Sequence, residues 1–443
     1  MSEMNDAKTS ADSSGNENVN VSGGSATLGL KKYISPTMFK ELKSGMGFLI
    51  FYSLLFFIIT VVYLIGANDS FMDLKNNVNE TISGVDLFKY YLDYTYYNQT
   101  VNLYCSGAII VILGFLSIIE AIRNFSFLGD RRKGDFYFSQ PVTRVNLYIT
   151  NFVKGIINVM LPVTVFYLIG IVATLSMGQR YGVHDCSVII VPILQFYVLL
   201  FMAYIMFYLL NIIAILLTGR MFTSVCMTGF MHLVLVVGYG LSTMIFDNKP
   251  TVEVVNYEIN GRIVDKINII FNKFLFRFSP VTYISRIYED YFYNKFFYSE
   301  RYISGNGEET SVDIIRQTPT MDIFPLEAIY IIAIIAILAV VGIMLMNRRK
   351  AEMTESAFTY PIVEDVVQGI ITVYGGVLLG VLFYEMLSEA QFALGAILGG
   401  LISFFVVGFI CKLDYKEVFV KKKIPTLVVS AVVLVIATIA FYA

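Results

Sequence analysis

Long apolar runs alternate with polar segments along most of the chain. A run of about 20 apolar residues can cross the hydrocarbon core of a bilayer as a helix, and about nine runs meet this condition. The pattern therefore predicts an all-α polytopic membrane protein. The predicted spans are residues 46–66, 103–122, 150–176, 188–218, 225–246, 325–347, 367–387, 393–411 and 425–442.

Two features inside these runs predict how the helices pack. The third and fourth runs are longer than the membrane requires, so we expect them to tilt or bend, with a kink at Pro162. The seventh and eighth runs contain Gly376-x-x-x-Gly380 and Gly395-x-x-x-Gly399. Small residues one turn apart let helix backbones approach closely, so we expect these two spans to contact each other.

The polar segments differ in character. Residues 1–30 are rich in Ser, Asn and Gly, which predicts a disordered cytoplasmic segment, and they lack the apolar region of a signal peptide. Residues 31–45 have an amphipathic pattern, which predicts a helix in the membrane interface or, alternatively, an extension of the first span. Residues 348–366 are predicted to form a cytoplasmic linker.

The segment 247–324 is too long to be a simple connection between spans. Its alternating stretch 252–259 predicts a hairpin, and its aromatic, amphipathic stretch 269–288 predicts contact with the outer leaflet. We therefore expect a small extracellular domain, with a poorly ordered loop as the alternative.

Lys and Arg residues predict the orientation. Most of the 32 lie before the first span or in alternate connections, including the loop 123–149. Because positive charges concentrate on the cytoplasmic side, we expect the N-terminus inside and the C-terminus outside. There is no Trp, so the 30 Tyr and 36 Phe residues must supply the aromatic belts at the interfaces.

Composition narrows the classes of function. Charged residues make up 15% of the chain, against roughly 25% in soluble domains. The net charge is −2 and no long basic stripe occurs, so we expect no nucleic-acid partner. The four Cys residues have no metal-type spacing. Cys105 and Cys186 fall near the outer face, where a disulfide is conceivable, although buried thiols are the favoured interpretation.

The chain carries little chemistry of its own. It has no P-loop, no H-E-x-x-H and no G-x-S-x-G motif, so we expect neither an enzyme nor a bound metal or cofactor. Within the spans, Glu120 and Glu385 lie near a boundary, where solvation explains them, while Asn158 and Asn211 suit hydrogen bonds between helices. The alternative is that Glu120, Asn158 and Asn211 line a pathway or act in gating.

The loop between the second and third spans has an unusual order of residues. Charged residues at 130–135 precede the aromatic stretch 136–138, and Pro141 disfavours helix at the residue before it. Thr143 is suited to cap the next helix. We expect a short helix across the inner surface, a bend, and then a membrane helix. Such an element could transmit a push from a partner; the alternative is a solvated basic loop.

This order resembles that of permeases of type-2 ABC exporters. In that family an acidic residue is followed by basic residues and Gly, then by a short apolar helix, and then by Ser-Leu-Pro-(Val/Ile)-(Ser/Thr)-Arg. The chain differs in having Asp130 for Glu, Asp135 for Thr and Gln140 for Leu. The matching positions here are Asp130, Gly134, Ser139, Pro141, Val142, Thr143 and Arg144.

Two further segments of the chain resemble segments of the same family. Residues 278–283 resemble the Ser-Pro segment that precedes the last core span of the family. Residues 348–361 resemble the tail that follows this span in Firmicutes permeases with extra C-terminal helices, some of which belong to operons linked to antibiotic response at the cell envelope.

The resemblance implies an architecture and partners. Residues 46–347 would be a six-helix core, with 123–149 as its coupling loop and 367–442 as three additional helices. The partners would be a P-loop ATPase subunit, a second permease subunit, identical or paralogous, and membrane lipid. The residues that couple to the ATPase would be Asp130, Arg131, Arg132, Lys133, Gly134, Pro141 and Arg144.

These observations lead to one expected function and one competing hypothesis. We expect a permease subunit of an ABC exporter in a bacterial cell membrane, which moves an amphipathic or envelope-active substrate. The competing hypothesis is a sensor or scaffold for envelope stress that transports nothing. An intramembrane enzyme has no support, because the sequence offers no nucleophile–base pair and no metal constellation.

Overall fold

The computed structural model describes residues 45–81, 96, 100, 104–182, 190–246, 279–288, 324–349, 356–387, 391–412 and 423–442. Over these ranges the chain is helical, and its only strand-like pairing is one isolated bridge between Thr218 and Phe358. Nine of the described helices are long and apolar enough to cross a membrane, which confirms the predicted all-α polytopic fold.

The helices follow the predicted order. Their bounds are α2 Met46–Thr81, α4 Gly107–Phe125, η1 (a 3₁₀ turn) Ser126–Gly129, α5 Arg131–Phe138, α6 Arg144–Tyr181, α7 Ile190–Leu217, α8 Met221–Phe246, α10 Pro280–Ile287, α12 Phe324–Arg348, α13 Pro361–Met386, α14 Phe392–Lys412 and α16 Ile424–Tyr442.

Several helices extend beyond the apolar runs that predicted them. α2 continues to Thr81 instead of ending at 66, α6 begins at Arg144, and α13 begins at Pro361. Hydropathy detects only the apolar part of a helix, whereas backbone hydrogen bonds continue wherever neighbours support them. Tyr181 in the last turn of α6, for instance, donates a hydrogen bond of 2.8 Å to the Asn68 side chain of α2. Pro162 lies inside α6 without ending it.

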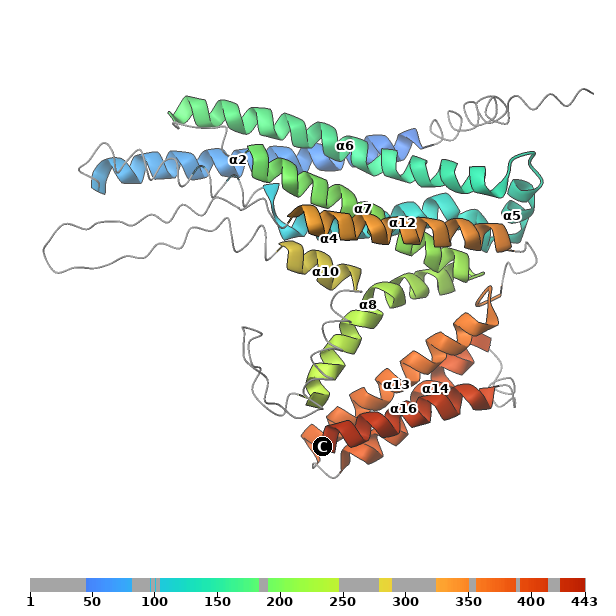
Figure 1. Cartoon of the computed structure of the whole chain (residues 1–443). Helices are drawn as coiled ribbons and strands as arrows, with labels where there is room; N and C mark the ends of the chain where they lie inside the picture. Colours follow the sequence, from blue (N-terminus) through green and yellow to red (C-terminus); the bar gives the residue numbers. More distant parts are fainter. Residues whose placement is uncertain are drawn as a thin grey trace, which may run out of the picture.

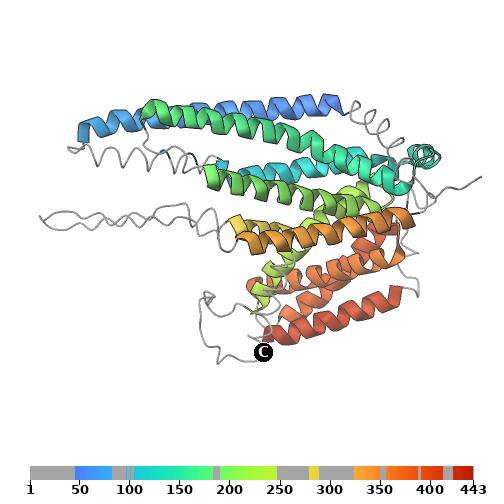
Figure 2. The same cartoon turned by 45° about the horizontal axis from the view of Figure 1, so that its top comes forward.

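α7 is the central helix of the main bundle. Of its apolar span, 83% is buried inside the protein, against 11% for the corresponding part of α2. α4 and α12 pack along α7, and α2 packs along α6 (Figures 1 and 2). α5 lies at one end of this bundle and α10 lies towards the other (Figure 1). These are called the α5 end and the α10 end below.

α8 runs at a slant away from the main bundle and meets a second group of helices, α13, α14 and α16 (Figure 1). Leu241 of α8 packs with Val377 and Leu434 of this group, and Tyr374 donates a hydrogen bond of 2.8 Å to the carbonyl of Val234. The three C-terminal helices are therefore attached to the bundle mainly through α8.

α13 and α14 pack closely through their glycines, as predicted. A Cβ atom added at Gly399 would lie 2.5 Å from the carbonyl oxygen of Gly375, and one at Gly395 would lie 2.6 Å from that of Leu379. Only residues without a side chain permit this backbone approach.

Several expectations fall outside the described residues: the disordered segment 1–30, residues 31–44 of the interfacial helix, and most of the loop 247–324. From that loop α10 is described, capped by the hydroxyl of Ser279. Its residues Tyr283, Ile284 and Ile287 are buried, and the helix packs on α7 and α8. Cys105 is a buried free thiol, and Cys186 is not among the described positions.

Candidate functional site

The loop between α4 and α6 has the predicted helix–turn–helix form. Asp130 caps α5 by accepting hydrogen bonds from the backbone N–H groups of Arg132 (3.0 Å) and Lys133 (3.4 Å). The chain leaves the helix after Phe138, passes Pro141, and re-enters a helix at Arg144, where the Thr143 hydroxyl accepts from the N–H of Asn146 at 3.3 Å. The predicted turn and cap are both confirmed.

α5 has one packed face and one open face. Tyr137 and Phe138 lie against Phe127 of η1, with ring centroids 4.6 and 6.4 Å apart, and Phe127 itself is buried. Gly134 is buried in the middle of α5. The open face carries Arg131, Arg132, Lys133, Asp135 and Phe136, of which Phe136 is 62% exposed. An exposed aromatic ring beside three cations is suited to contact another protein.

Arg144 connects this loop to the end of α12. Its guanidinium donates to the carbonyls of Asn347 (3.2 Å) and Arg349 (2.5 Å), and it lies 5.0 Å from the centre of the Phe138 ring. A single side chain at the start of α6 therefore contacts both α5 and the C-terminal end of α12.

Arg349 follows α12 and is 1% exposed. It donates to the carbonyls of Ile215 (2.9 Å) and Leu216 (2.9 Å) in the last turn of α7, and to that of Leu128 (2.8 Å) in η1. The last carbonyls of a helix lack intrahelical partners and carry partial negative charge, so a cation is stabilised there. Burial lowers the pKa of Arg349 to about 10, which leaves it charged at neutral pH.

The segment before α13 is attached at the same place. The N–H of Thr359 donates to the carbonyl of Leu217 at 2.9 Å, and the N–H of Gly219 donates to that of Ala357 at 3.4 Å. We call Arg144, Arg349 and the carbonyls that they hold the arginine hub. The arginine hub lies where α5 and η1 meet the start of α6 and the C-terminal ends of α7 and α12. The bridge between Thr218 and Phe358, which leads to α13, lies at the same place.

A buried polar cluster lies directly before η1 in α4. Glu120 is 0% exposed, which corrects the expectation that it is solvated at the membrane boundary. Its carboxylate accepts hydrogen bonds from Arg123 (2.6 Å) and Asn124 (3.0 Å). Arg123 in turn lies 4.4 Å from the ring centre of Phe48 in α2. The positive charge of Arg123, one turn away, offsets the free-energy cost of burying this carboxylate.

The cluster also joins α4 to α6 and α7. Asn124 donates to the hydroxyl of Tyr208 at 3.1 Å, and Tyr208 donates to the carbonyl of Asn151 at 3.1 Å. Glu120 and its partners therefore connect α4, α6 and α7 immediately beside the loop that carries α5.

The other two predicted residues lie in different surroundings. Asn211 donates to the hydroxyl of Ser117 at 2.8 Å and pairs with the ring of His232 at 2.7 Å, so it links α7 to α4 and α8 as predicted. Asn158 does not make the hydrogen bond between helices that was expected of it: it is fully buried, and its amide atoms have no hydrogen-bond partner in the part of the chain that the structure describes.

The structure thus brings the predicted coupling residues onto one loop, with Glu120 beside it, and places Asn158 and Asn211 elsewhere in the bundle. Sequence reasoning missed Arg349, because Arg348-Arg349-Lys350 has the appearance of an ordinary basic cluster beside a membrane. Among the described residues, no group of His, Cys, Asp and Glu could hold a metal ion.

The fold and these contacts define an all-α, multi-pass membrane protein in which a short polar helix is fastened to the ends of several membrane-spanning helices. Comparisons of the chain with protein-family models, with curated proteins and with solved structures found no match.

Proposed function

We propose that this chain is the membrane-spanning permease subunit of an ABC exporter, and that a separate P-loop ATPase subunit docks on α5. The observation that carries the proposal is the attachment of α5 to the bundle. The helix rests on η1 through Tyr137 and Phe138, and Arg144 links it to the end of α12. The motif that resembles the exporter family, from Asp130 to Arg144, lies in this same loop.

The arginine hub supplies a route for force. A partner that presses on Arg131, Arg132 or Lys133 would displace α5, and α5 continues through η1 into α4. Because Arg349 holds η1 and the end of α7 together, both would be displaced with it. ATP-driven closure of the partner would thereby shift the membrane helices as a group. Transport would then move an amphipathic or envelope-active substrate along a path shared with a second permease subunit.

The proposal also fixes an orientation. The α5 end would face the cytoplasm of a bacterial cell, where the ATPase and its nucleotide are found, and the α10 end would face outward. The chain would need no cofactor of its own. A sensor or scaffold without transport is the competing hypothesis, and the same docking surface would then hold a partner that moves nothing.

The first experiment is a pull-down of the tagged protein from mild detergent with identification of its partners. We expect a P-loop ATPase to co-purify. Replacing Arg131, Arg132 and Lys133 together by Glu should abolish this association. The matched control is Arg180→Glu, an exposed arginine in the last turn of α6. If no ATPase binds while the protein remains folded, the proposal fails.

Reconstitution in vesicles separates an exporter from a scaffold. Together with its ATPase, the wild-type protein should move an amphipathic substrate at the expense of ATP. Pro141→Ala should leave hydrolysis intact and abolish transport, because it removes the bend between α5 and α6. Gly134→Val, at the buried position of α5, should act in the same way. Full transport by both variants would contradict the coupling role, and ATPase binding without transport by the wild type would favour the scaffold.

A further inference from the structure

Only one of the two carboxylate oxygens of Glu120 is paired. The hydrogen bonds from Arg123 (2.6 Å) and Asn124 (3.0 Å) both end on Oε2. The other oxygen, Oε1, is buried and accepts no hydrogen bond within the part of the chain that the structure describes. A buried acceptor without a donor carries a cost in free energy, because it has lost its contacts with water. A hydroxyl that reached Oε1 would form a strong, charge-assisted hydrogen bond.

Tyr52 of α2 supplies a hydroxyl in the right place. The residue is 1% exposed and interacts electrostatically with Glu120, so its polar end faces the carboxylate. No hydrogen bond of normal length and angle joins the two groups, and among the described residues the Tyr52 hydroxyl has no other partner. An unpaired donor and an unpaired acceptor therefore face each other from neighbouring helices. Each would satisfy the other if α2 and α4 came closer together.

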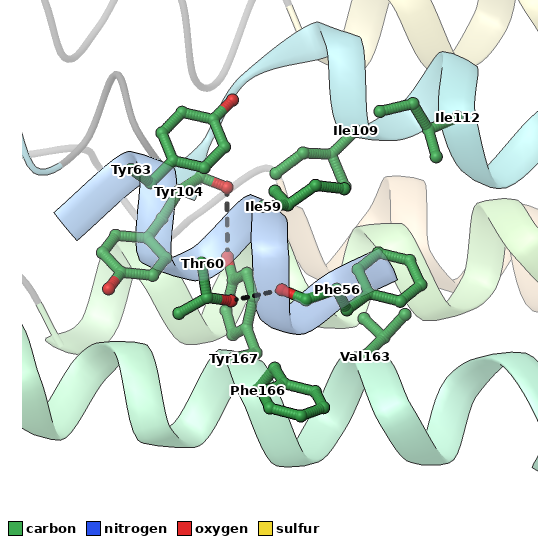
Figure 3. Close-up of a pocket in the computed structure, with 10 residues that line it drawn as sticks. All are labelled: Phe56, Ile59, Thr60, Tyr63, Tyr104, Ile109, Ile112, Val163, Phe166 and Tyr167. Atoms are coloured by element: carbon green, nitrogen blue, oxygen red, sulfur yellow. Dashed lines mark hydrogen bonds between the residues drawn. The ribbon is translucent and has the colours of Figure 1, made fainter. Parts of the chain in front are cut away.

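The two helices have room to approach. α2 packs along α6 and only weakly against α4. One turn beyond Tyr52, a cavity of about 50 Å³ lies between α2, α4 and α6 (Figure 3). Phe56 and Ile59 of α2 line it on one side, and Ile109 and Ile112 of α4 line it on another. Side chains that line a cavity lack dispersion contacts on that side, so a shift of α2 that narrows this space is favourable.

The cavity and the unpaired groups lie on matching faces of α2 and α4. Tyr52 comes four residues before Phe56 on α2, and Glu120 comes eight residues after Ile112 on α4. Steps of four residues keep side chains on one side of a helix. A single approach of α2 to α4 would therefore narrow the cavity and bring the Tyr52 hydroxyl to Oε1 of Glu120.

We infer that Tyr52 and Glu120 form a latch, a hydrogen bond that is open in this arrangement and closes when α2 and α4 approach each other. α4 continues through η1 towards α5, so a displacement of α5 moves Glu120 as well. The arginine hub joins η1 to the ends of α6, α7 and α12, and the closed latch adds α2 to this group. The inference rests on the proposed function only for the force that closes the latch.

The test places fluorotyrosine at position 52 of the full chain in lipid nanodiscs. Fluorine NMR then distinguishes a free hydroxyl from one that is bound to a carboxylate. We expect two exchanging signals. Glu120→Gln should reduce the share of the bonded signal, since a neutral amide oxygen is a weaker acceptor than a carboxylate. Fluorotyrosine at position 208 is the control and should give one signal, because the Tyr208 hydroxyl is already bonded to Asn124 and Asn151.

A second pair of variants tests the movement of α2. Ile112→Phe fills the cavity and should remove the bonded signal at position 52, because α2 can no longer approach α4. Val111→Phe changes a neighbouring residue that is 59% exposed and should leave both signals unchanged. A single signal at position 52 in the otherwise unchanged chain, whether free or bonded, would overturn the inference. So would a bonded signal that persists in folded Ile112→Phe.

Thermal unfolding gives an independent readout. Tyr52→Phe should leave the unfolding temperature unchanged or raise it, because it removes a buried hydroxyl that is unpaired in this arrangement. Tyr208→Phe should lower it, because a fully buried hydroxyl loses two hydrogen bonds. Equal losses in the two variants would mean that the latch is always closed, and the inference would fail. These measurements need no ATPase, so their failure and that of the pull-down are told apart.

Discussion

Arg349 donates a hydrogen bond of 2.8 Å to the carbonyl of Leu128, which lies 221 residues earlier in the chain. Two further bonds from the same guanidinium reach the last turn of α7. The planar guanidinium carries five N–H donors in a fixed geometry, which suits it to hold carbonyls of two elements at once, whereas an ammonium group offers three donors without this geometry. Arg349 is therefore the residue that makes η1 and the ends of α7 and α12 one unit.

The first prediction concerns this residue. Arg349→Met should lower the free energy of unfolding by about 3 kcal/mol, because three buried carbonyls lose a charged donor. Arg349→Lys should fall between this variant and the wild type, since an ammonium group keeps the charge without the fork geometry. Thermal or denaturant unfolding in detergent measures both.

The neighbouring arginine supplies the control. The side chain of Arg348 is exposed, so Arg348→Met should change stability by at most about 0.5 kcal/mol. The two Met variants remove the same charge from adjacent positions. Equal losses of stability would mean that the contacts of Arg349 are not what holds the ends of these helices together.

The second prediction decides between structural support and a pathway role for Asn211. Because Asn211 bonds to both Ser117 and His232, Asn211→Ala should destabilise the bundle. A double-mutant cycle with His232→Ala should give a coupling energy of about 1 kcal/mol, within the range for hydrogen bonds between membrane helices. The pathway role would be favoured if the effects of the two variants on the free energy of unfolding simply add. It would also be favoured if Asn211→Ala loses transport while its stability is unchanged.

The third prediction tests the contact between α13 and α14. Gly399→Ala places a Cβ atom 2.5 Å from the carbonyl oxygen of Gly375, so the helices must move apart at a cost of about 1–3 kcal/mol. Gly229→Ala in α8 is the control, because nothing lies within 4 Å of the added atom. It should be neutral or stabilising, since Ala favours helix. Unfolding of the purified protein measures both; a neutral Gly399→Ala would contradict the close packing.

Some of these features could be predicted from the sequence, and the reason is that their signals are local. Nine apolar runs give nine helices because membrane thickness sets their length. The turn around Pro141, the cap at Thr143 and the packing of Gly395 and Gly399 follow from residues within a few positions of each other. The extent of α2 and α6 was underestimated because polar residues such as Asn68 continue a helix when a neighbouring helix binds them.

The contacts of Glu120 and Arg349 could not be predicted, because the burial of a charge depends on groups far away in the chain. Glu120 sits in an apolar run beside a basic residue, a pattern that also fits a solvated boundary. Its burial depends on Phe48, which covers Arg123, and on Tyr208, which binds Asn124. In the same way, Arg349 is buried because its guanidinium donates to the carbonyls of Ile215 and Leu216 at the end of α7, while Arg348 stays exposed.

The fourth prediction concerns the pH dependence of the three C-terminal helices. Lys423, just before α16, lies 3.0 Å from Glu364 and 2.6 Å from Asp365 at the start of α13. Burial alone would lower the pKa of Lys423, but hydrogen bonds to Asp365 and Glu364 outweigh it and raise the pKa above 10.5. The folded protein therefore holds this proton more tightly than the unfolded chain does.

It follows that the ion pair contributes its full stabilisation below pH 10.5, the ordinary pKa of lysine. This stabilisation is lost as the pH rises through the higher pKa that Lys423 has in the folded protein. Lys423→Met should be less stable than the wild type at pH 8, and the difference should shrink above about pH 10.5. Thermal unfolding of both proteins at a series of pH values measures this. Lys133→Met, at an exposed lysine 3.7 Å from Asp130, should show almost no difference at any pH. The difference in stability between Lys423→Met and the wild type could instead stay constant up to pH values well above 10.5. That result would show that Lys423 stabilises the fold by packing and not by its charge.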